Sequence, residues 1–317
     1  MAYLGVDIGG TKIITAIADG EGRVLCQENF HTPREGGPEA VLAAIETSFR
    51  CLMDTHNIPQ SEVQGTGIGC GGPLDPYAGR IEKVVNLPGW EGLLLSQYFS
   101  DAFSAPAFLD NDVNLAALGE ARRGAGINIS NMAYLNVGTG IGGGIVIDGR
   151  LYRGNGNAAE FGHQIVLPNG PDCPCGNHGC LESLCSGTSI ARRAREYLEQ
   201  NPKSIILESA QEIERVTGAH VSHAARLDDE LALKIWKETA QYLGIGVANI
   251  INILNPGRIV LGGGVVMKNI DLLFEPAKTV AIARAMPVLA RDTEIVTAEL
   301  GEDAGVIGAI CLAMEGL

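Results

Sequence analysis

The sequence has no long hydrophobic run. No stretch of about 18 uncharged apolar residues occurs in its 317 residues, which excludes a typical membrane-spanning helix. Positive charge is also scarce: the formal net charge is −14, whereas a nucleic-acid-binding surface needs lysine and arginine to neutralise phosphates. The first residues show no basic segment followed by a cleavage site, so we expect no secretory signal and a cytoplasmic location.

Cysteine is sparse outside one loop. Three of the eight cysteines, Cys173, Cys175 and Cys180, lie close together in a glycine-rich stretch. A disulfide would leave one thiol over, and a bond between cysteines two positions apart would be strained, so the loop favours a metal site. The other five stand alone in apolar or mixed surroundings, as is typical of buried reduced thiols: Cys26, Cys51, Cys70, Cys185 and Cys311.

The C-x-C-x4-C spacing supplies three of the four ligands of a structural zinc site. His178 inside the loop and His163 upstream of it are both candidates for the fourth ligand. Glu160 and His163 precede the thiols, and Glu182 follows them. Two carboxylates and an imidazole gathered by such a loop are suited to hydrogen-bond the vicinal hydroxyls of a sugar, although polar residues also surround ordinary surface loops.

Glycine is abundant, with 42 residues, and it clusters in short runs after apolar strands. Backbone N–H groups in such turns can point at an anion, and threonine hydroxyls and a lysine add further donors. The P-loop spacing is absent. The stretch GTGIGG matches the dinucleotide fingerprint only superficially, because it leads into a strand pattern and not a helix. The candidate phosphate-binding residues are Gly9, Gly10, Thr11 and Lys12; Gly138, Thr139 and Gly140; and Gly262, Gly263 and Gly264.

Asp7 stands directly before the first glycine turn. A carboxylate at this position could bind Mg²⁺, directly or through water, or it could only cap the turn. A second acidic stretch, LDNDVN at 109–114, lies where a strand is followed by a helix. An aspartate at a helix N-terminus stays ionised and can accept a hydroxyl proton during phosphoryl transfer. Position alone does not choose between Asp110 and Asp112, and helix capping explains one polar residue of this stretch.

Alternating and helical apolar patterns predict an α/β protein. The first three strands are expected to be antiparallel, and the C-terminal half is expected to be mostly helical. The predicted strands cover 3–8, 13–19, 24–32, 63–70, 106–110 and 258–262, and the predicted helices cover 37–56, 111–123, 186–201, 228–254 and 303–314.

An internal repeat links the two halves of the chain. Tyr3, Leu4, Val6 and Gly9 recur with the same spacing as Tyr134, Leu135, Val137 and Gly140. In both places a strand, a glycine turn and a second strand follow in order. We therefore expect a duplication that gives two similar domains with a cleft between them.

Several longer stretches resemble the ROK family of sugar kinases, and most closely its bacterial glucokinases. They are DIGGTK, NLPGW at 86–90, LDNDVNLAALGE, VGTGIGGGIVIDGRLYRGNGNAAEFGH, CPCGNHGCLES and NILNPGRIVLGGGV. The resemblance implies a two-domain actin-like (ribonuclease H-like) ATPase fold with an interdomain cleft. It implies an α/β domain over 1–113, completed by the C-terminal helix 303–317, and a second α/β domain over 114–302 with a zinc loop at 163–182.

The resemblance also implies roles for individual residues. Asp112 would be the catalytic base, and Asn111 would contact the sugar together with Glu160, His163 and Glu182. His163 would bind sugar through one ring nitrogen and zinc through the other, beside the three loop cysteines. Where the family often has Pro-Gly-Pro, this chain has Gly-Gly-Pro, so of that motif only Gly72 is carried over to the sugar site.

The expected function is ATP- and Mg²⁺-dependent phosphorylation of the 6-hydroxyl of a hexose, glucose first. Alternatives are a kinase for N-acetylmannosamine, fructose or allose, and a non-catalytic sugar sensor. A ROK repressor would carry a helix-turn-helix before the kinase-like body, whereas here the first strand begins near residue 3. Relatives form homodimers and homotetramers, so an oligomer is expected, with no nucleic-acid or membrane partner.

Overall fold

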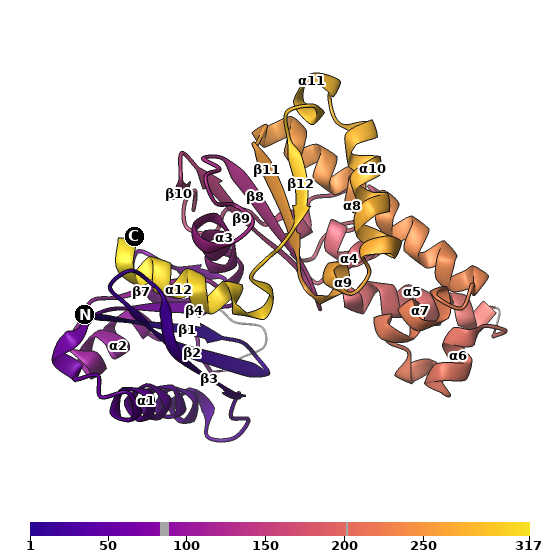
Figure 1. Cartoon of the computed structure of the whole chain (residues 1–317). Helices are drawn as coiled ribbons and strands as arrows, with labels where there is room; N and C mark the ends of the chain where they lie inside the picture. Colours follow the sequence, from indigo (N-terminus) through magenta and orange to yellow (C-terminus); the bar gives the residue numbers. More distant parts are fainter. Residues whose placement is uncertain (83–88, 201) are drawn as a thin grey trace. The chain divides into compact units, whose positions relative to one another are not determined.

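The computed structural model describes residues 1–82, 89–200 and 202–317 (Figure 1). Three residues of the NLPGW stretch, 86–88, therefore lie outside the described residues. The chain folds into two compact units. The first unit contains 1–130, 144–159 and 299–317, and the second contains 131–143 and 160–298. The N- and C-termini both belong to the first unit.

A five-stranded sheet with the order β3-β2-β1-β4-β7 forms the centre of the first unit. Its strands are β1 (Ala2–Ile8), β2 (Lys12–Asp19), β3 (Val24–His31), β4 (Val63–Cys70) and β7 (Ala107–Asn111). The first three are antiparallel, as the sequence predicted, and β4 and β7 continue the sheet in parallel. Two short strands, β5 (Leu74–Asp75) and β6 (Arg80–Ile81), pair beside it.

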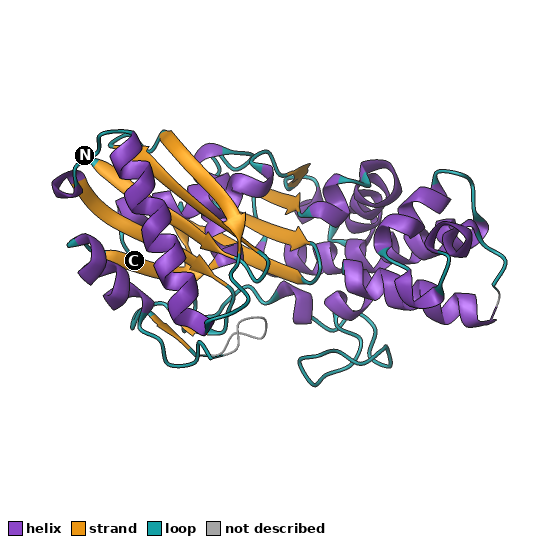
Figure 2. Ribbon diagram, turned by 90° about the horizontal axis from the view of Figure 1, so that it is seen from below, coloured by secondary structure: helices purple, strands orange, loops and turns teal. Residues whose placement is uncertain are grey.

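Helices cover both faces of this sheet, because successive side chains of its strands point to opposite sides. Ile13 and Ile17 of β2 belong to a core shared with α1 (Gly37–Thr55) and α2 (Leu95–Phe103). Ile14 and its neighbours on the other face pack against α12 (Ala304–Glu315), which also packs on α3 (Asp112–Arg123). Figure 1 draws α1 and α12 on opposite sides of the strands, and α1 crosses in front of them in Figure 2.

Helix α12 packs so closely against β4 and α3 that no side chain fits between their backbones at two points. A methyl group added at Gly67 of β4 would lie 1.8 Å from the carbonyl oxygen of Ala309 on α12. A methyl group at Gly308 of α12 would lie 1.7 Å from the carbonyl oxygen of Leu115 on α3. Glycine is required at both contacts because backbone atoms occupy the space of a side chain.

A buried carboxylate on α3 fixes two other chain segments of the first unit. Glu120 is fully buried and accepts hydrogen bonds from the backbone N–H groups of Ala125, Glu299 and Leu300, at 2.7, 3.0 and 2.8 Å. Ala125 lies five residues before Ser130, where the chain first leaves the first unit, and Glu299 is the residue at which it returns for the last time. One side chain thus anchors both segments.

The second five-stranded sheet has the order β10-β9-β8-β11-β12. Its strands are β8 (Met132–Val137), β9 (Ile141–Ile147), β10 (Arg150–Leu151), β11 (Arg258–Gly262) and β12 (Glu294–Thr297). Strand β11 runs parallel to both β8 and β12. The order is the same as in the first sheet, with β8 in the place of β1, so the repeat seen in the sequence corresponds to a repeat of topology.

Helices make up most of the rest of the second unit. The longest, α8 (Glu230–Leu254), begins at its N-cap Asp229, whose side chain accepts from the N–H of Ala232, and ends at Asn255 in the left-handed conformation. The others are α4 (Leu181–Cys185), α5 (Gly187–Gln200), α6 (Ile205–Ala210), α7 (Gly218–Ala225), α9 (Gly264–Met267), α10 (Glu275–Arg284) and α11 (Pro287–Ala290). Short 3-10 turns cover 60–62, 161–163, 213–215 and 301–303, and a π-helical turn covers 270–274.

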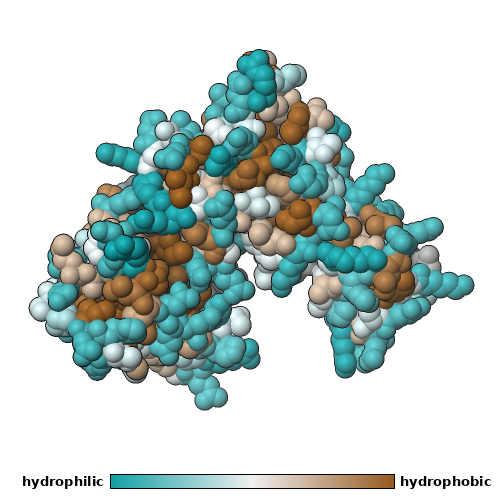
Figure 3. Space-filling model, in the orientation of Figure 1, coloured by the Kyte–Doolittle hydropathy of each residue, from teal (hydrophilic) through white to brown (hydrophobic). Residues whose placement is uncertain are grey.

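Within the described part of the chain, no helix is both long enough and apolar enough to cross a membrane. On the face drawn in Figure 3, hydrophilic residues cover much of the surface, and hydrophobic residues gather in separate patches.

Candidate functional site

The first glycine turn joins β1 to β2 in the first unit. The N–H of Gly9 donates to the carbonyl of Lys12 at 3.0 Å, and the hydroxyl of Thr32 donates to the carbonyl of Gly9 at 2.7 Å. Gly10 and Thr11 at its tip are exposed. The ammonium of Lys12 lies 2.7 Å from a carboxylate oxygen of Glu302. The turn is therefore held by backbone contacts, with its donors at the surface of the unit.

Asp7 lies near the end of β1, with only part of its side chain at the surface. Burial and then the negative charge of Asp112 raise the pKa of Asp7 to about 7, although the charge of Lys12 acts in the opposite direction. A methyl group at Gly305, in the first turn of α12, would lie 2.5 Å from a carboxylate oxygen of Asp7. The same two carboxylates, after burial, raise the pKa of the Cys70 thiol, which stays protonated. This region has an excess of negative charge, a setting that favours a bound cation.

Asp110 and Asp112, which position in the sequence alone did not separate, have different surroundings in the structure. Asp110 is fully buried, and its carboxylate accepts from the side chains of Arg153 and Asn114 at 2.5 and 2.9 Å. Asp112 is half-buried at the first position of α3, where its Oδ1 accepts from the N–H of Val113 at 2.9 Å. Asp112 is therefore the more accessible of the two aspartates.

Asn111 is the N-cap of α3. Its Oδ1 accepts from the backbone N–H groups of Val113 and Asn114, at 2.9 and 3.3 Å. Its Nδ2 faces the loop after β4, where a methyl group on Gly72 would lie 3.4 Å away. The structure thus brings Gly72, Asn111 and Asp112 together at one edge of the first sheet.

Asn157 is a neighbour of this group that the sequence analysis missed. Its Oδ1 accepts from the N–H of Leu74 at 3.2 Å, and its Nδ2 donates to the carbonyl of Leu74 at 3.1 Å. A methyl group at Gly72 would lie 3.7 Å from that Oδ1. Its partner is 83 positions away in the chain, so no local pattern could have identified it.

In the second unit, the predicted zinc ligands converge. One ligand atom from each of His163, Cys173, Cys175 and Cys180 lies within 4.8 Å of the other three. The Sγ atoms of Cys175 and Cys180 are 3.7 Å apart, and the Sγ of Cys173 lies 3.6 Å from Nδ1 of His163. Bonds of about 2.3 Å to sulfur and about 2.0 Å to nitrogen place tetrahedral ligands about 3.8 and about 3.5 Å apart. The donor set therefore fits zinc in type, number and spacing.

His178, the alternative fourth ligand, has another partner. Its Nδ1 lies 2.7 Å from a carboxylate oxygen of Asp172, at the surface of the loop. Among the described residues, the group that could hold a metal contains His163 and not His178.

Glu182 and Gly162, the residue before His163, both lie against the backbone of Ile141, the first residue of β9. Glu182 accepts from the N–H of Ile141 at 2.7 Å, and a methyl group at Gly162 would lie 2.2 Å from the carbonyl of Ile141. The Nε2 of His163 lies 3.8 Å from a carboxylate oxygen of the exposed Glu160. Nδ1 of His163 thus faces Cys173, and its Nε2 faces the carboxylate of Glu160.

The glycine turns of the second unit form one group. The N–H of Gly138 donates to the carbonyl of Gly140 at 2.9 Å, and a methyl group at Gly140 would lie 2.6 Å from Glu182. Gly263 has a φ of +86°, and a methyl group there would lie 2.4 Å from the carbonyl of Val137. Gly262 ends β11, and Gly264 begins α9. The candidate phosphate-binding residues thus lie beside a candidate sugar-binding carboxylate.

The sequence analysis missed the start of α5 as a part of this group. The N–H of Gly187 donates to the carbonyl of Gly138 at 2.8 Å, and the hydroxyl of Thr188 donates to the carbonyl of Thr139 at 2.9 Å. These two contacts join the start of α5 to the glycine turn at 138–140. The Ser186 cap was the available signal, but it showed only where the helix begins.

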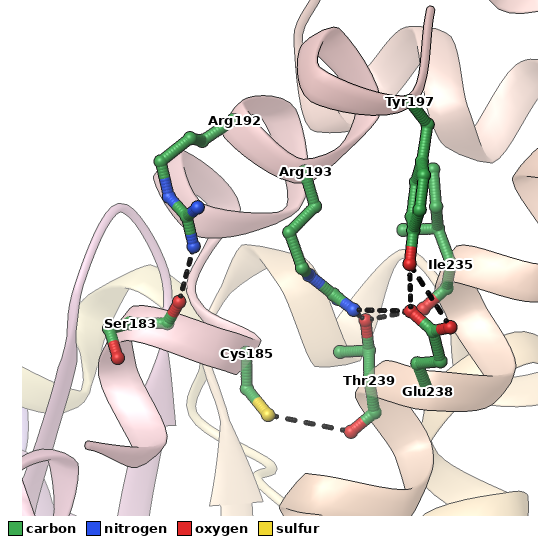
Figure 4. Close-up of polar contacts among 8 residues, drawn as sticks. All are labelled: Ser183, Cys185, Arg192, Arg193, Tyr197, Ile235, Glu238 and Thr239. Carbon is green, nitrogen blue, oxygen red and sulfur yellow. Dashed lines mark hydrogen bonds and ion pairs between the residues drawn. The ribbon is translucent and has the colours of Figure 1, made fainter. Parts of the chain in front are cut away.

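Helix α4, which carries Glu182, is held by polar contacts with α5 and α8 (Figure 4). A guanidinium nitrogen of Arg192 donates to the carbonyl of Ser183 at 2.9 Å, and the thiol of Cys185 donates to the carbonyl of Thr239 at 3.4 Å. Buried Arg193 reaches Glu238 at 3.1 Å and also contacts Thr239. These contacts fix the orientation of the helix between the zinc ligands and the glycine turn.

Comparison with known proteins agrees with this arrangement. The ROK family model matches residues 3–315. A glucokinase of Halalkalibacterium halodurans is 38% identical over 308 residues, covering 96% of this chain and 93% of that protein. A glucokinase of Thermotoga maritima is 34% identical over 316 residues, covering 99% and 98%.

Among solved structures, a ROK family glucokinase from Streptomyces griseus, in complex with glucose and AMPPNP, has a TM-score of 0.82 at 32% identity and covers 100% of both chains. The two-domain actin-like ATPase fold expected from the sequence is confirmed. The chain belongs to the ROK family.

Proposed function

We propose that this protein is an ATP-dependent hexokinase that phosphorylates the 6-hydroxyl of glucose. The observation that carries the proposal is the position of Asp112. This residue is half-buried at the start of α3, near Gly72 and Asn111, and its negative charge raises the pKa of Asp7. The glucokinases that the chain resembles over nearly its full length support glucose as the first substrate.

The chemical role of the protein is mainly to position the reactants. Asp112 accepts the proton of the 6-hydroxyl as that oxygen attacks the terminal phosphate. The candidate contacts to the sugar hydroxyls are Gly72, Asn111, Glu160, His163 and Glu182. The candidate contacts to the phosphates are the backbone N–H groups of the glycine turns. Holding two reactants in line supplies much of the rate in such a reaction.

Two metals fit the residues present. Asp7 fits Mg²⁺, because burial and the charge of Asp112 raise its pKa to about 7, and a bound cation would stabilise its ionised form. When bound, Mg²⁺ would neutralise the negative charge of the phosphates. His163 and the three loop cysteines fit a structural Zn²⁺ with four protein ligands and no position left for a substrate.

The zinc loop would act as a support for the sugar site. His163 is both a candidate ligand and a candidate sugar contact, and Glu182 follows Cys180 by two positions. A metal that fixes this loop also fixes both side chains. Other hexoses, N-acetylmannosamine among them, remain the alternative substrates, and a homodimer or homotetramer the proposed assembly.

The test is a coupled ADP-release assay with ATP over a panel of hexoses, with Asp112→Asn as the matched variant. We expect turnover on glucose, a fall in kcat of about 10²- to 10⁴-fold in the variant, and glucose binding that survives in calorimetry. Near-normal turnover in Asp112→Asn would refute its role as base. No ADP release on any hexose would favour the non-catalytic sensor.

A further inference from the structure

The ion pair between Asp110 and Arg153 connects two segments on which the proposed site depends. The Asp110 side chain is 0% exposed and the Arg153 side chain 11%, so solvent screens this pair little. Nε of Arg153 donates to Oδ2 of Asp110 at 2.5 Å. The other oxygen, Oδ1, accepts from the N–H of Asn111 at 2.8 Å and from Nδ2 of Asn114 at 2.9 Å. The carboxylate thus joins Arg153 to the backbone of the residue before Asp112.

Arg153 also organises its own loop, which follows β10. Its carbonyl accepts from the N–H groups of Gly156 and Ala158, at 2.8 and 3.1 Å. This compact turn presents Asn157, whose amide makes two hydrogen bonds with the backbone of Leu74, directly after the loop that contains Gly72. Arg153 is therefore linked to the group formed by Gly72, Asn111 and Asp112 by two indirect routes, one through Asp110 and one through Asn157.

We propose that Arg153 is a positioning residue for the sugar side of the reaction. It does not touch the reacting atoms; through Asp110 it fixes Asn111 and Asp112, and through its loop it fixes Asn157 and the Gly72 loop. Both sugar-binding geometry and the aim of the base depend on it, whereas the glycine turns that would hold ATP have other supports. The inference rests on the proposed kinase function.

The test compares three variants with the wild-type protein. Arg153→Met keeps the side chain out to the position of Nε and removes every donor. Arg153→Gln keeps an N–H donor at the position of Nε, because its Nε2 stands the same number of bonds from the backbone. Asp110→Asn/Arg153→Met removes the buried charge, while the Oδ1 of the new amide can still accept from Asn111 and Asn114. This double variant decides the question if Arg153→Met alone fails to fold.

We expect Arg153→Met and the double variant to lose at least about tenfold in kcat/KM for glucose, with a raised glucose KM and a lowered kcat. The KM for ATP should stay within about twofold of wild type. Arg153→Gln should recover most of the loss. Arg291→Met is the control, since it removes an exposed arginine that pairs with Asp292, and its kinetics should be unchanged.

Wild-type glucose kinetics in the folded double variant would overturn the proposal. So would a kcat that falls only with the folded fraction, with both KM values unchanged, because that is the result of a purely stabilising role. A wild-type protein without activity on any hexose would instead refute the proposed function, so the two failures are distinguishable.

Discussion

Three carboxylates of the first unit have different partners, and the partner decides what each residue can do. Glu120 is bound by backbone N–H groups and holds chain segments together. Asp110 is bound by a cation and fixes a loop. Asp7 lies close to the negative charge of Asp112, so its ionised form is unfavourable until a cation binds.

Replacing Asp7 by asparagine should therefore stabilise the protein in the absence of nucleotide and magnesium. An acid whose pKa rises from 3.8 to about 7 on folding holds its proton more tightly in the folded state. The free energy of unfolding is then highest below pH 4, falls as the pH rises towards 7 and stays low above it. We expect Asp7→Asn to gain on the order of 4 kcal/mol at pH 8.

Thermal unfolding at pH 4.5 and pH 8 checks this prediction. The variant should have the higher melting temperature at pH 8, and the difference should shrink at the lower pH. Its kinase activity should be lost, because the carboxylate that fits Mg²⁺ is gone. Equal melting temperatures of the variant and the wild type at pH 8 would show that ionised Asp7 does not destabilise the folded protein.

At this scale the sequence was informative about residue types and not about partners. It predicted that an acid of the stretch 109–114 has a chemical role, but position alone could not separate Asp110 from Asp112, and only the family resemblance chose Asp112. The distinction depends on Arg153, 43 positions away, and on burial, neither of which a local pattern contains. The choice between His163 and His178 as fourth metal ligand also depended on a partner, because His178 pairs with Asp172 while His163 lies beside the cysteines.

At the scale of elements, α12 is bound by close backbone contact and not by large side chains alone. Gly67 and Gly308 allow the helix to approach β4 and α3. The long helices and main strands were predictable because each spans enough positions to show its period. The short helices α6, α9 and α11, of six, four and four residues, span too few.

Gly67→Ala should be strongly destabilising. Its methyl group would lie 1.8 Å from a backbone oxygen of α12, so the helix must move, at a cost of about 3 kcal/mol. Chemical denaturation gives the change in unfolding free energy. Gly20→Ala is the matched control, because its methyl group would meet only Met1 at 3.8 Å, and its stability should change by less than about 0.5 kcal/mol. Equal effects of the two substitutions would contradict the backbone contact.

The zinc loop gives a second prediction for an element. Removal of the proposed zinc by a chelator should lower the melting temperature and raise the glucose KM together, because the segment 163–182 holds both the candidate zinc ligands and Glu182. Metal content by mass spectrometry, melting temperature and glucose KM are measured on the same sample. His178→Ala should bind zinc and have an unchanged glucose KM, whereas Cys180→Ser should fail to bind zinc and have a raised glucose KM. Full activity in metal-free protein would exclude the supporting role.

At the scale of the whole molecule, two sheets share one strand order. Four matching residues in the sequence indicated a repeat, but the order of five strands is visible only in the structure. The copies have also diverged. Asp7 corresponds to Gly138 in the register of the repeat, so only the first copy carries this acid.

Glu120→Gln tests how the chain is anchored where it leaves and re-enters the first unit. The amide would point its own N–H groups at backbone donors, leaving at least one of them without an acceptor. We expect a loss of about 2 kcal/mol in unfolding free energy, measured by denaturant titration. Glu315→Gln, which alters an exposed pair with Arg122, should have little effect. A neutral result for Glu120→Gln would mean that other contacts hold these segments.

The return of residues 299–317 to the first unit has a consequence for synthesis. A ribosome makes the first strands early, but it makes every residue of the second unit before it makes α12. Until then, the face of the first sheet that receives this helix, with its glycines and apolar residues, has no cover of its own. The first unit can therefore complete its fold only after all residues of the second unit have been synthesised. The nascent chain is most prone to aggregate between the synthesis of the first strands and that of α12.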